Sequence, residues 1–263
     1  YSNYGKDIDI AGPGGNTRGG EAGGVLQNTI KVGNPRESGY YAFMGTSMAS
    51  PHVAGVAALI VGEGVTNPDM VEQILKDTAR KPHDQKYVRD RYGAGIVDAP
   101  AAVRAARGEA GGVELGLGLA MAAAVAGGLR RRGKLGARLG VGYLAGVVVG
   151  ASGLFFVPYL APGASSWPVV HALTHGLPSW DLSILGASAH GHALFFSAAI
   201  PFALLALGLG APRARAPLAG LAVGVAAHLA FHAAVPLAFG ASALWLAINA
   251  AVCVGLAHLA LRK

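Results

Sequence analysis

The N-terminal part of the chain is organised around GTSMASPHVAG, residues 45–55, which continues into the apolar segment 56–61. Small and apolar residues dominate this stretch, which predicts a buried helix that begins close to Ser47. A serine at a strand-to-helix junction exposes its hydroxyl beside the N–H groups and partial positive charge of the helix N-terminus. Gly45 keeps the approach free of side chains. The pattern therefore exposes the Ser47 hydroxyl at a helix start, where an ordinary N-cap role is the common alternative to a chemical one.

The residues before the motif predict short strands and turns. A strand-like run at 7–11 ends in the Gly-Pro-Gly-Gly turn at 12–15, and a Gly-rich flexible loop follows at 19–24. A second short strand is expected at 40–44, directly before the motif. Strands that alternate with helices predict a piece of an α/β domain.

Two further helices are expected after the motif. Asn67 and Pro68 form an N-cap and N1 pair that opens a helix over 69–78. Asp98 is expected to cap a last helix at 99–106, at the end of the α/β part of the chain.

Three blocks resemble the subtilisin-like serine proteases, the subtilases. They are the motif at 45–51, the preceding YSNYG…IDIAGPGG, and YGAGIVDAPAAV near the end of the α/β part. The resemblance covers residues 1 to about 107. It implies the C-terminal portion of a subtilisin-like peptidase domain, an α/β fold with a parallel sheet. In that domain Ser47 is the acyl-forming nucleophile, and its own N–H is one oxyanion donor.

The resemblance also implies that the remaining catalytic groups lie upstream of Tyr1. In this family the triad Asp and His and the oxyanion Asn precede the serine by more than the 46 residues that precede Ser47 here. His52 falls where the family has a structural histidine, and His83 lies in a polar loop and is expected to be exposed to solvent. The 263-residue chain alone is therefore expected not to hydrolyse peptides.

The balance of basic and acidic residues differs between the two sides of Gly112. Residues 1–112 hold 12 Lys+Arg and 12 Asp+Glu, whereas residues 113–263 hold 9 and 2, so the second part carries the whole net charge of +7. Its basic clusters alternate with long apolar runs, which is the positive-inside pattern of membrane proteins. The pattern predicts a lipid bilayer as partner and excludes a nucleic-acid binder. The single cysteine, Cys253, excludes a disulfide scaffold.

A linker at 108–112 is expected to lead into an all-α polytopic transmembrane bundle. About 20 residues per crossing give five spans, at about 113–129, 139–160, 187–209, 218–239 and 242–261. The basic loops after the first and third spans and the basic C-terminus then lie on the cytoplasmic side. The protease part lies outside the cytoplasm in this topology, which requires an export signal upstream of Tyr1.

Seven of the nine histidines lie in the membrane part: His171, His175, His190, His192, His228, His232 and His258. His228 and His232 share a helix face, and His192 is expected at a similar depth in the preceding span. One hypothesis is a metal site built from His190, His192, His228 and His232. The pattern is similar to membrane-bound metal-dependent hydrolases with a His-x-x-x-Asp motif, but His232 stands in place of the Asp. The alternatives are hydrogen bonds between helices or a polar cavity, and a proton relay.

The sequence thus favours a membrane-tethered extracytoplasmic serine endopeptidase that acts on extracytoplasmic polypeptides. It implies no cofactor and no resident metal for the protease part, and it leaves the oligomeric state open. A second reading is a His-bearing membrane protein for metal binding or transport that carries a vestigial protease segment. A third is an artefactual join of two genes at 108–112.

Overall fold

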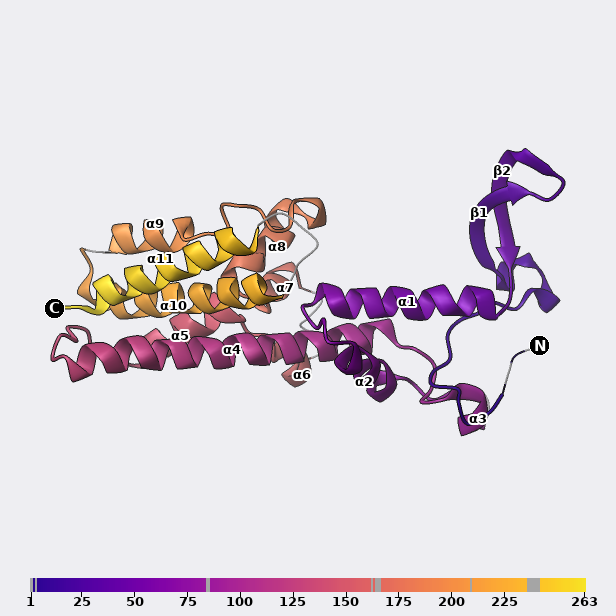
Figure 1. Cartoon of the computed structure of the whole chain (residues 1–263), viewed down its shortest axis with the longest axis horizontal. Helices are drawn as coiled ribbons and strands as arrows, with labels where there is room; N and C mark the ends of the chain where they lie inside the picture. The colour runs from indigo at the N-terminus through magenta and orange to yellow at the C-terminus, as the bar shows by residue number, and fades with distance from the viewer. Residues whose placement is uncertain are drawn as a thin grey trace. The chain divides into compact units, whose positions relative to one another are not determined.

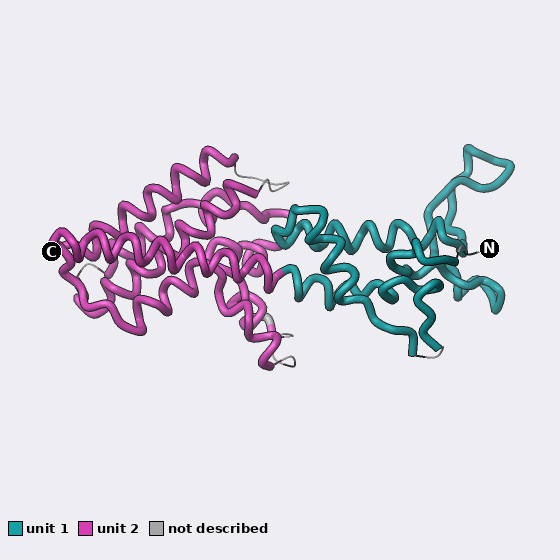
Figure 2. Tube along the Cα trace, turned by 60° about the horizontal axis from the view of Figure 1, so that its bottom comes forward, with its two compact units in different colours: residues 1–106 teal, residues 107–263 magenta. Residues whose placement is uncertain are grey.

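The computed structural model describes residues 2, 4–83, 86–161, 163, 167–208, 210–235 and 242–263. It divides into two compact units, residues 1–106 and residues 107–263, shown in different colours in Figure 2. The first unit has a single hydrophobic core cluster, and the second has two.

The first unit contains an antiparallel β-hairpin, which projects beside helix α1 in Figure 1. Strand β1 (Val25–Lys31) pairs with β2 (Asn34–Phe43), with Val25 opposite Phe43. The strand expected at 40–44 is the end of β2, whereas β1 was not predicted. The expected flexible loop at 19–24 contains one of two short 3₁₀ turns instead.

The strand expected at 7–11 is reduced to isolated bridges. The Ala11 N–H donates to the Gly95 carbonyl at 2.8 Å, and the Val97 N–H donates to the Ala11 carbonyl at 2.8 Å. The bridge between Ala11 and Ile96 is parallel, and it is the trace of the expected parallel sheet within the described residues. The two-stranded sheet that does form is antiparallel.

Helix α1 (Thr46–Gly62) begins where the motif predicts, but it is only partly buried. Val56 and Ile60 lie in the core, whereas Leu59 is 52% exposed and Val61 is 41% exposed. The expectation of a buried helix is therefore wrong for one face of α1. The reason is that the core of this unit covers the helix only on the side of Val56 and Ile60.

The two predicted N-caps of the first unit are confirmed. The Asn67 side chain accepts hydrogen bonds from the N–H groups of Asp69 and Met70 at the start of α2 (Pro68–Thr78). The Asp98 carboxylate accepts one from the N–H of Ala101 at 3.0 Å, in the first turn of α4. A short helix, α3 (Arg89–Tyr92), lies between them in the chain.

Helix α4 (Ala99–Arg131) is 33 residues long. It does not end near residue 106, and the residues expected to be a linker, 108–112, are helical. Glu109 and Ala110, which have high helix propensity, lie among the three glycines of this segment, and the helix continues through it.

The second unit is built around α10 (Pro212–Ala234), against which α5 (Val141–Ala151), α9 (Ala199–Gly208) and α11 (Ala243–Leu261) pack (Figure 1). Shorter segments connect them: α6 (Val157–Leu160), α7 (Pro168–Leu173), the 3₁₀ turn η4 (Leu177–Trp180) and α8 (Asp181–Leu185).

Three helices, α4, α10 and α11, are long and apolar enough to cross a membrane. They include the expected spans 113–129 and 242–261 and most of 218–239, whose end at 236–239 lies outside the described residues. The expected spans 139–160 and 187–209 are not continuous helices. Within the described residues, the first contains α5, with 11 residues, and the four-residue α6. The second contains a 3₁₀ turn at Ala187–Ala189 and α9, with 10 residues, and residue 209 is not described.

A local feature of the backbone limits the length of each of these two helices, α5 and α9. Helix α5 ends at Ala151 because Gly153 adopts a φ of +60°, a left-handed conformation that terminates helices. Before α9, the residues from His190 to His192 fold around the Asp181 carboxylate, which accepts hydrogen bonds from the N–H groups of Gly191 and His192. Pro201 lies in the first turn of α9, where it favours the start of the helix rather than a kink.

Helices α5 and α10 pack through glycines at four-residue spacing. A Cβ on Gly146 or Gly150 would meet backbone atoms of α10, and a Cβ on Gly220 or Gly224 would meet backbone atoms of α5. Such small-residue interfaces let two backbones approach closely and are typical of helix pairs in membranes.

Candidate active site

Ser47 is the second residue of α1, and its side chain is exposed. The helix begins after Gly45, which has a φ of +151° and a carbonyl that accepts hydrogen bonds from Met48 and Ala49. The N–H of Ser47 precedes the first intrahelical donor, so it points out of the helix N-terminus and is available to a negatively charged oxygen. Among the described residues, the Ser47 hydroxyl has no hydrogen-bond partner.

The turn at 12–15 packs directly against this helix start. The N–H of Gly45 donates to the Gly14 carbonyl at 2.7 Å. A Cβ on Gly14 would lie 2.8 Å from the Gly45 carbonyl oxygen, and one on Gly12 would lie 2.8 Å from the Ala49 carbonyl oxygen. Only glycine allows this approach, so the turn and the first turn of α1 form one rigid piece.

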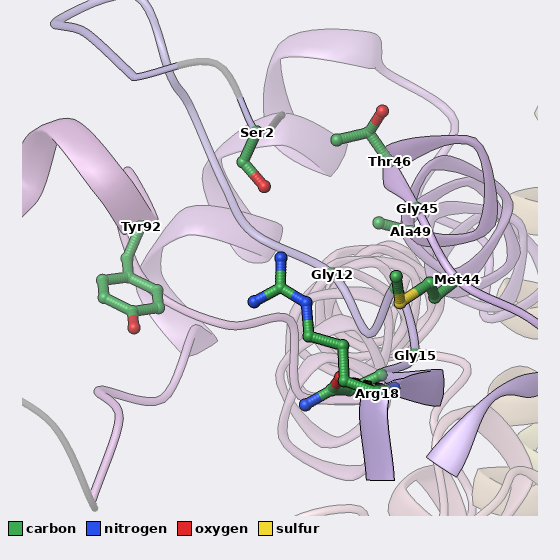
Figure 3. Close-up of a pocket in the computed structure, with 11 residues that line it drawn as sticks. Ser2, Gly12, Gly15, Arg18, Met44, Gly45, Thr46, Ala49 and Tyr92 are labelled. Carbon is green, nitrogen blue, oxygen red and sulfur yellow. Dashed lines mark hydrogen bonds between the residues drawn. The ribbon is translucent and has the colours of Figure 1, made fainter. Parts of the chain in front are cut away.

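An open pocket of about 480 Å³ lies beside this piece. Gly12, Gly45 and Thr46 line it, and the Arg18 side chain extends into it (Figure 3). Tyr92 stands on the other side. The pocket therefore gives solvent access to the residue that precedes Ser47 and supplies one positive charge.

Neither histidine of residues 1–106 serves as a base for Ser47. His52 Nδ1 donates to the Met48 carbonyl one turn earlier in α1, at 2.7 Å, so this ring is bound to its own helix. His83 is exposed, as the sequence predicts. The described part of this unit therefore contains a serine beside the N–H groups of a helix N-terminus, without an adjacent acid–base pair.

The four histidines of the metal-site hypothesis differ in their hydrogen-bond partners. His228 and His232 have ring centroids 4.4 Å apart, and both approach Glu114. His190 is instead bound through Nδ1 to the Asp181 carboxylate at 2.8 Å. His192 turns its Nδ1 to the N–H of Leu194 at 3.3 Å, and so it does not join the His228 pair.

Sequence reasoning missed both carboxylate partners. Glu114 lies at the edge of an apolar run and was not paired with a histidine, and Asp181 was expected in the outer loop of His171 and His175 rather than beside His190. Burial alone would raise the pKa of Asp181, but hydrogen bonds from His190 and from two backbone N–H groups hold that pKa below its ordinary value. His171 and His175 stay together, with ring centroids 5.0 Å apart.

Comparison with known proteins assigns families to the two parts of the chain. Residues 1–95 match the family model described as the subtilase family, Peptidase S8. Residues 122–263 match one described as a domain of unknown function, DUF5942. The N-terminal part is thus a subtilase segment, as the three sequence blocks predict.

The relatives of the N-terminal part are proteases. The chain is 42% identical over 110 residues to the extracellular protease of Xanthomonas campestris pv. campestris, covering 40% of this chain and 17% of that protein. It is 38% identical over 117 residues to the extracellular basic protease of Dichelobacter nodosus, covering 41% of this chain and 17% of that one.

A solved structure, described as proteases from Pseudoalteromonas arctica PAMC 21717, is 46% identical with a TM-score of 0.37. It is matched over 40% of this chain and 31% of that chain. The chain therefore spans only a small part of the length of these relatives.

Proposed function

The chain belongs to the family described as a domain of unknown function, DUF5942, and we propose that it is a membrane-tethered extracytoplasmic serine endopeptidase of the subtilisin type. Ser47 is the nucleophile of an acyl-enzyme mechanism, and its substrates are polypeptides outside the cytoplasm. One observation carries the proposal: an exposed serine at a helix N-terminus, inside the segment that matches the subtilase family.

In the proposed mechanism the Ser47 hydroxyl attacks the scissile carbonyl, and the oxygen that becomes negative lies against the Ser47 N–H. A helix N-terminus stabilises that charge because its N–H groups and dipole are already oriented. The proton acceptor is a histidine, oriented by an aspartate, from the part of a subtilase that precedes residue 1. The 263-residue chain alone is inactive because His52 is bound to its own helix.

Exposed apolar side chains in the first unit support a larger protease domain. Leu59 and Val61 on α1, and Leu26 and Ile30 on β1, are all more than 40% exposed. Each such side chain gains about 1.5–3 kcal/mol when it is buried. In the proposed whole enzyme these faces pack against the rest of the catalytic domain.

Tethering is supported by the outer face of α11. Leu244, Ile248, Val252 and Leu259 are between 46% and 71% exposed, although the opposite face of the helix packs into the bundle. A helix that is apolar on both sides is stable where lipid, not water, covers the outer side. The basic clusters between the apolar runs support a topology with the protease part outside the cytoplasm.

The test is labelling with a fluorophosphonate probe, which reacts only with an activated serine. The 263-residue chain should remain unlabelled, and the longer protein that includes the upstream triad residues should be labelled. Ser47→Ala should abolish labelling and lower peptide hydrolysis by several orders of magnitude, whereas Ser50→Ala, one turn later, should retain both. Labelling of the longer protein that persists in Ser47→Ala would contradict the proposal.

A further inference from the structure

The second unit contains a buried cluster of metal-binding groups, formed by Glu114 of α4 with His228 and His232 of α10. Glu114 Oε1 lies 3.1 Å from His228 Nδ1 and 3.3 Å from His232 Nε2. One ligand atom from each residue lies within 4.8 Å of the other two. We propose that this Glu-His-His cluster binds a divalent transition-metal ion of the zinc class.

The distances fit a shared ion. Two ligands bound at about 2.0–2.1 Å to a tetrahedral metal lie about 3.4 Å apart. The two measured separations, 3.1 and 3.3 Å, are close to that value, so an ion can replace both polar contacts with small side-chain movements. Two imidazoles and one carboxylate suit Zn²⁺ or Fe²⁺, whereas Ca²⁺ and Mg²⁺ prefer oxygen ligands throughout.

Charge in the bundle also favours a cation at this position. Glu114 is only 6% exposed and His228 only 2% exposed, and the helices around them are apolar. A carboxylate in such surroundings requires a compensating positive charge. A divalent ion supplies that charge and leaves both imidazoles neutral, as metal ligation requires.

The hydrogen-bond partners of His228 orient its ring, as the partners of a metal-bound imidazole do. Its Nε2 lies 3.1 Å from the Ser179 hydroxyl, and its Nδ1 lies 2.8 Å from the Ala151 carbonyl. With the proton on Nε2, the ring donates to Ser179 and directs the Nδ1 lone pair towards Glu114. Without a metal, a neutral ring that donates from Nδ1 to the Ala151 carbonyl carries its single proton on Nδ1. Metal binding at Nδ1 therefore requires the tautomer with that proton on Nε2, and the ring stays neutral.

His232 completes the ligand set from the next turn of α10. Its Nε2 contacts Glu114, and its Nδ1 is buried without a hydrogen-bond partner among the described residues. The ring is therefore positioned from the Glu114 side. The Phe196 ring packs on both imidazoles, with centroids 5.8 Å from His228 and 5.9 Å from His232.

A second interpretation of this cluster is a serine hydrolase triad, which includes His228 and Glu114. Ser179, His228 and Glu114 stand in the order of a serine hydrolase triad, with successive separations of 3.1 and 3.1 Å. However, Ser179 is only 7% exposed, and its own N–H donates to the Gly176 carbonyl at 2.9 Å. The serine thus has little access to a substrate, and its N–H is not free to stabilise an oxyanion. The second histidine on the carboxylate also has no role in a triad.

The experiment measures bound metal in the full chain, purified in detergent and reloaded with Zn²⁺ after chelation. We expect about one Zn²⁺ per chain. Glu114→Gln and His232→Gln should each lower Zn²⁺ affinity at least tenfold. Glu109→Gln, an exposed carboxylate on the same helix, and His258→Gln on α11 are the matched controls and should keep the metal.

Cobalt loading of the unaltered chain tests the ligand set even if a variant fails to fold. The Co²⁺ spectrum should show bands of a four-coordinate N/O site and no sulfur charge-transfer band, since Cys253 is not a ligand. Absence of stoichiometric Zn²⁺ in the unaltered chain, or its full retention in folded Glu114→Gln, would overturn the proposal. So would fluorophosphonate labelling of Ser179 in a Ser47→Ala background, which would assign the cluster to a triad. The readout is independent of protease activity at Ser47.

Discussion

At the scale of single residues, the position of Ser47 depends on the glycines that face it. The Gly45 N–H donates to the Gly14 carbonyl, and the backbone of the 12–15 turn touches the first turn of α1. A side chain at Gly14 would separate the two segments. The exposure of the Ser47 hydroxyl is therefore a property of the turn as much as of the helix.

This contact predicts that an alanine substitution is destabilising at Gly14 but has no effect at Gly19. Gly14→Ala should destabilise the packing of the turn on α1 by about 1–3 kcal/mol, because its Cβ would lie 2.8 Å from the Gly45 carbonyl oxygen. Gly19→Ala is the matched control, since its Cβ would meet nothing within 4 Å. Amide hydrogen exchange at the start of α1 measures the effect. Equal exchange rates in the two variants would contradict this account.

Asp181 gives a prediction that depends on pH. Its pKa is held below the ordinary value, so its charged form stabilises the folded state above the unfolded pKa of about 4, and this contribution disappears as pH falls through the lowered pKa. Asp181→Asn should therefore cost about 1–3 kcal/mol at neutral pH, and the difference should shrink in acid.

The measurement is unfolding of the full chain in detergent at several pH values. Asp7→Asn, at an exposed carboxylate of the first unit, should unfold as the unaltered chain does. If the difference in unfolding free energy between Asp181→Asn and the unaltered chain became larger below pH 4, the predicted direction of the pH dependence would be wrong.

At the scale of elements, the pairing of α5 with α10 rests on the close approach of their backbones. The double substitution Gly220→Ala with Gly224→Ala should lower the unfolding temperature, because both new Cβ atoms would meet carbonyl oxygens of α5. Gly255→Ala, on α11, meets nothing within 4 Å and should be neutral or stabilising by up to about 1 kcal/mol. Thermal unfolding of the full chain compares them. Destabilisation of similar size in both would exclude a specific role for this interface.

The same helices show what the sequence predicts and what it does not. Caps such as Asn67 and Asp98 were predicted because an N-cap hydrogen bond is local and uses residues only two or three positions apart. The segments 139–160 and 187–209 do not form single continuous helices. Hydropathy does not report a left-handed glycine or a carboxylate that binds backbone N–H groups. Both features break a helix inside an apolar run.

The candidate sites also differ in whether a local sequence pattern can predict them. Ser47 is carried by a contiguous motif, and the structure places it at the helix start that the motif predicts. The pairing of Glu114 with His228 joins residues of two helices more than a hundred positions apart, so no local pattern reports it. The four-histidine hypothesis grouped residues by depth and did not include the carboxylates, whereas the structure pairs His190 with Asp181 and the His228 pair with Glu114.

At the scale of the whole molecule, net charge and burial give the two parts different surroundings. The second part has a net charge of +7, and its two acidic residues, Glu114 and Asp181, are both buried. The outer faces of its helices are therefore apolar, with basic residues concentrated at the ends of apolar segments. This distribution is the pattern expected of a bilayer protein, and the positive-inside rule predicts an orientation in which the basic loops face the cytoplasm.

That orientation predicts which residues a membrane-impermeant maleimide reaches in intact cells. In a Cys253→Ala background, expressed with an export signal, Lys31→Cys at the exposed hairpin should be labelled, since residues 1–106 lie outside. Arg132→Cys, in the exposed basic segment after α4, should be labelled only after the cells are permeabilised. Labelling of Arg132→Cys in intact cells, with Lys31→Cys protected, would reverse the topology. It would place Ser47 in the cytoplasm, where the proposed extracytoplasmic substrates are absent, so the result also decides whether the proposed tether suits the proposed enzyme.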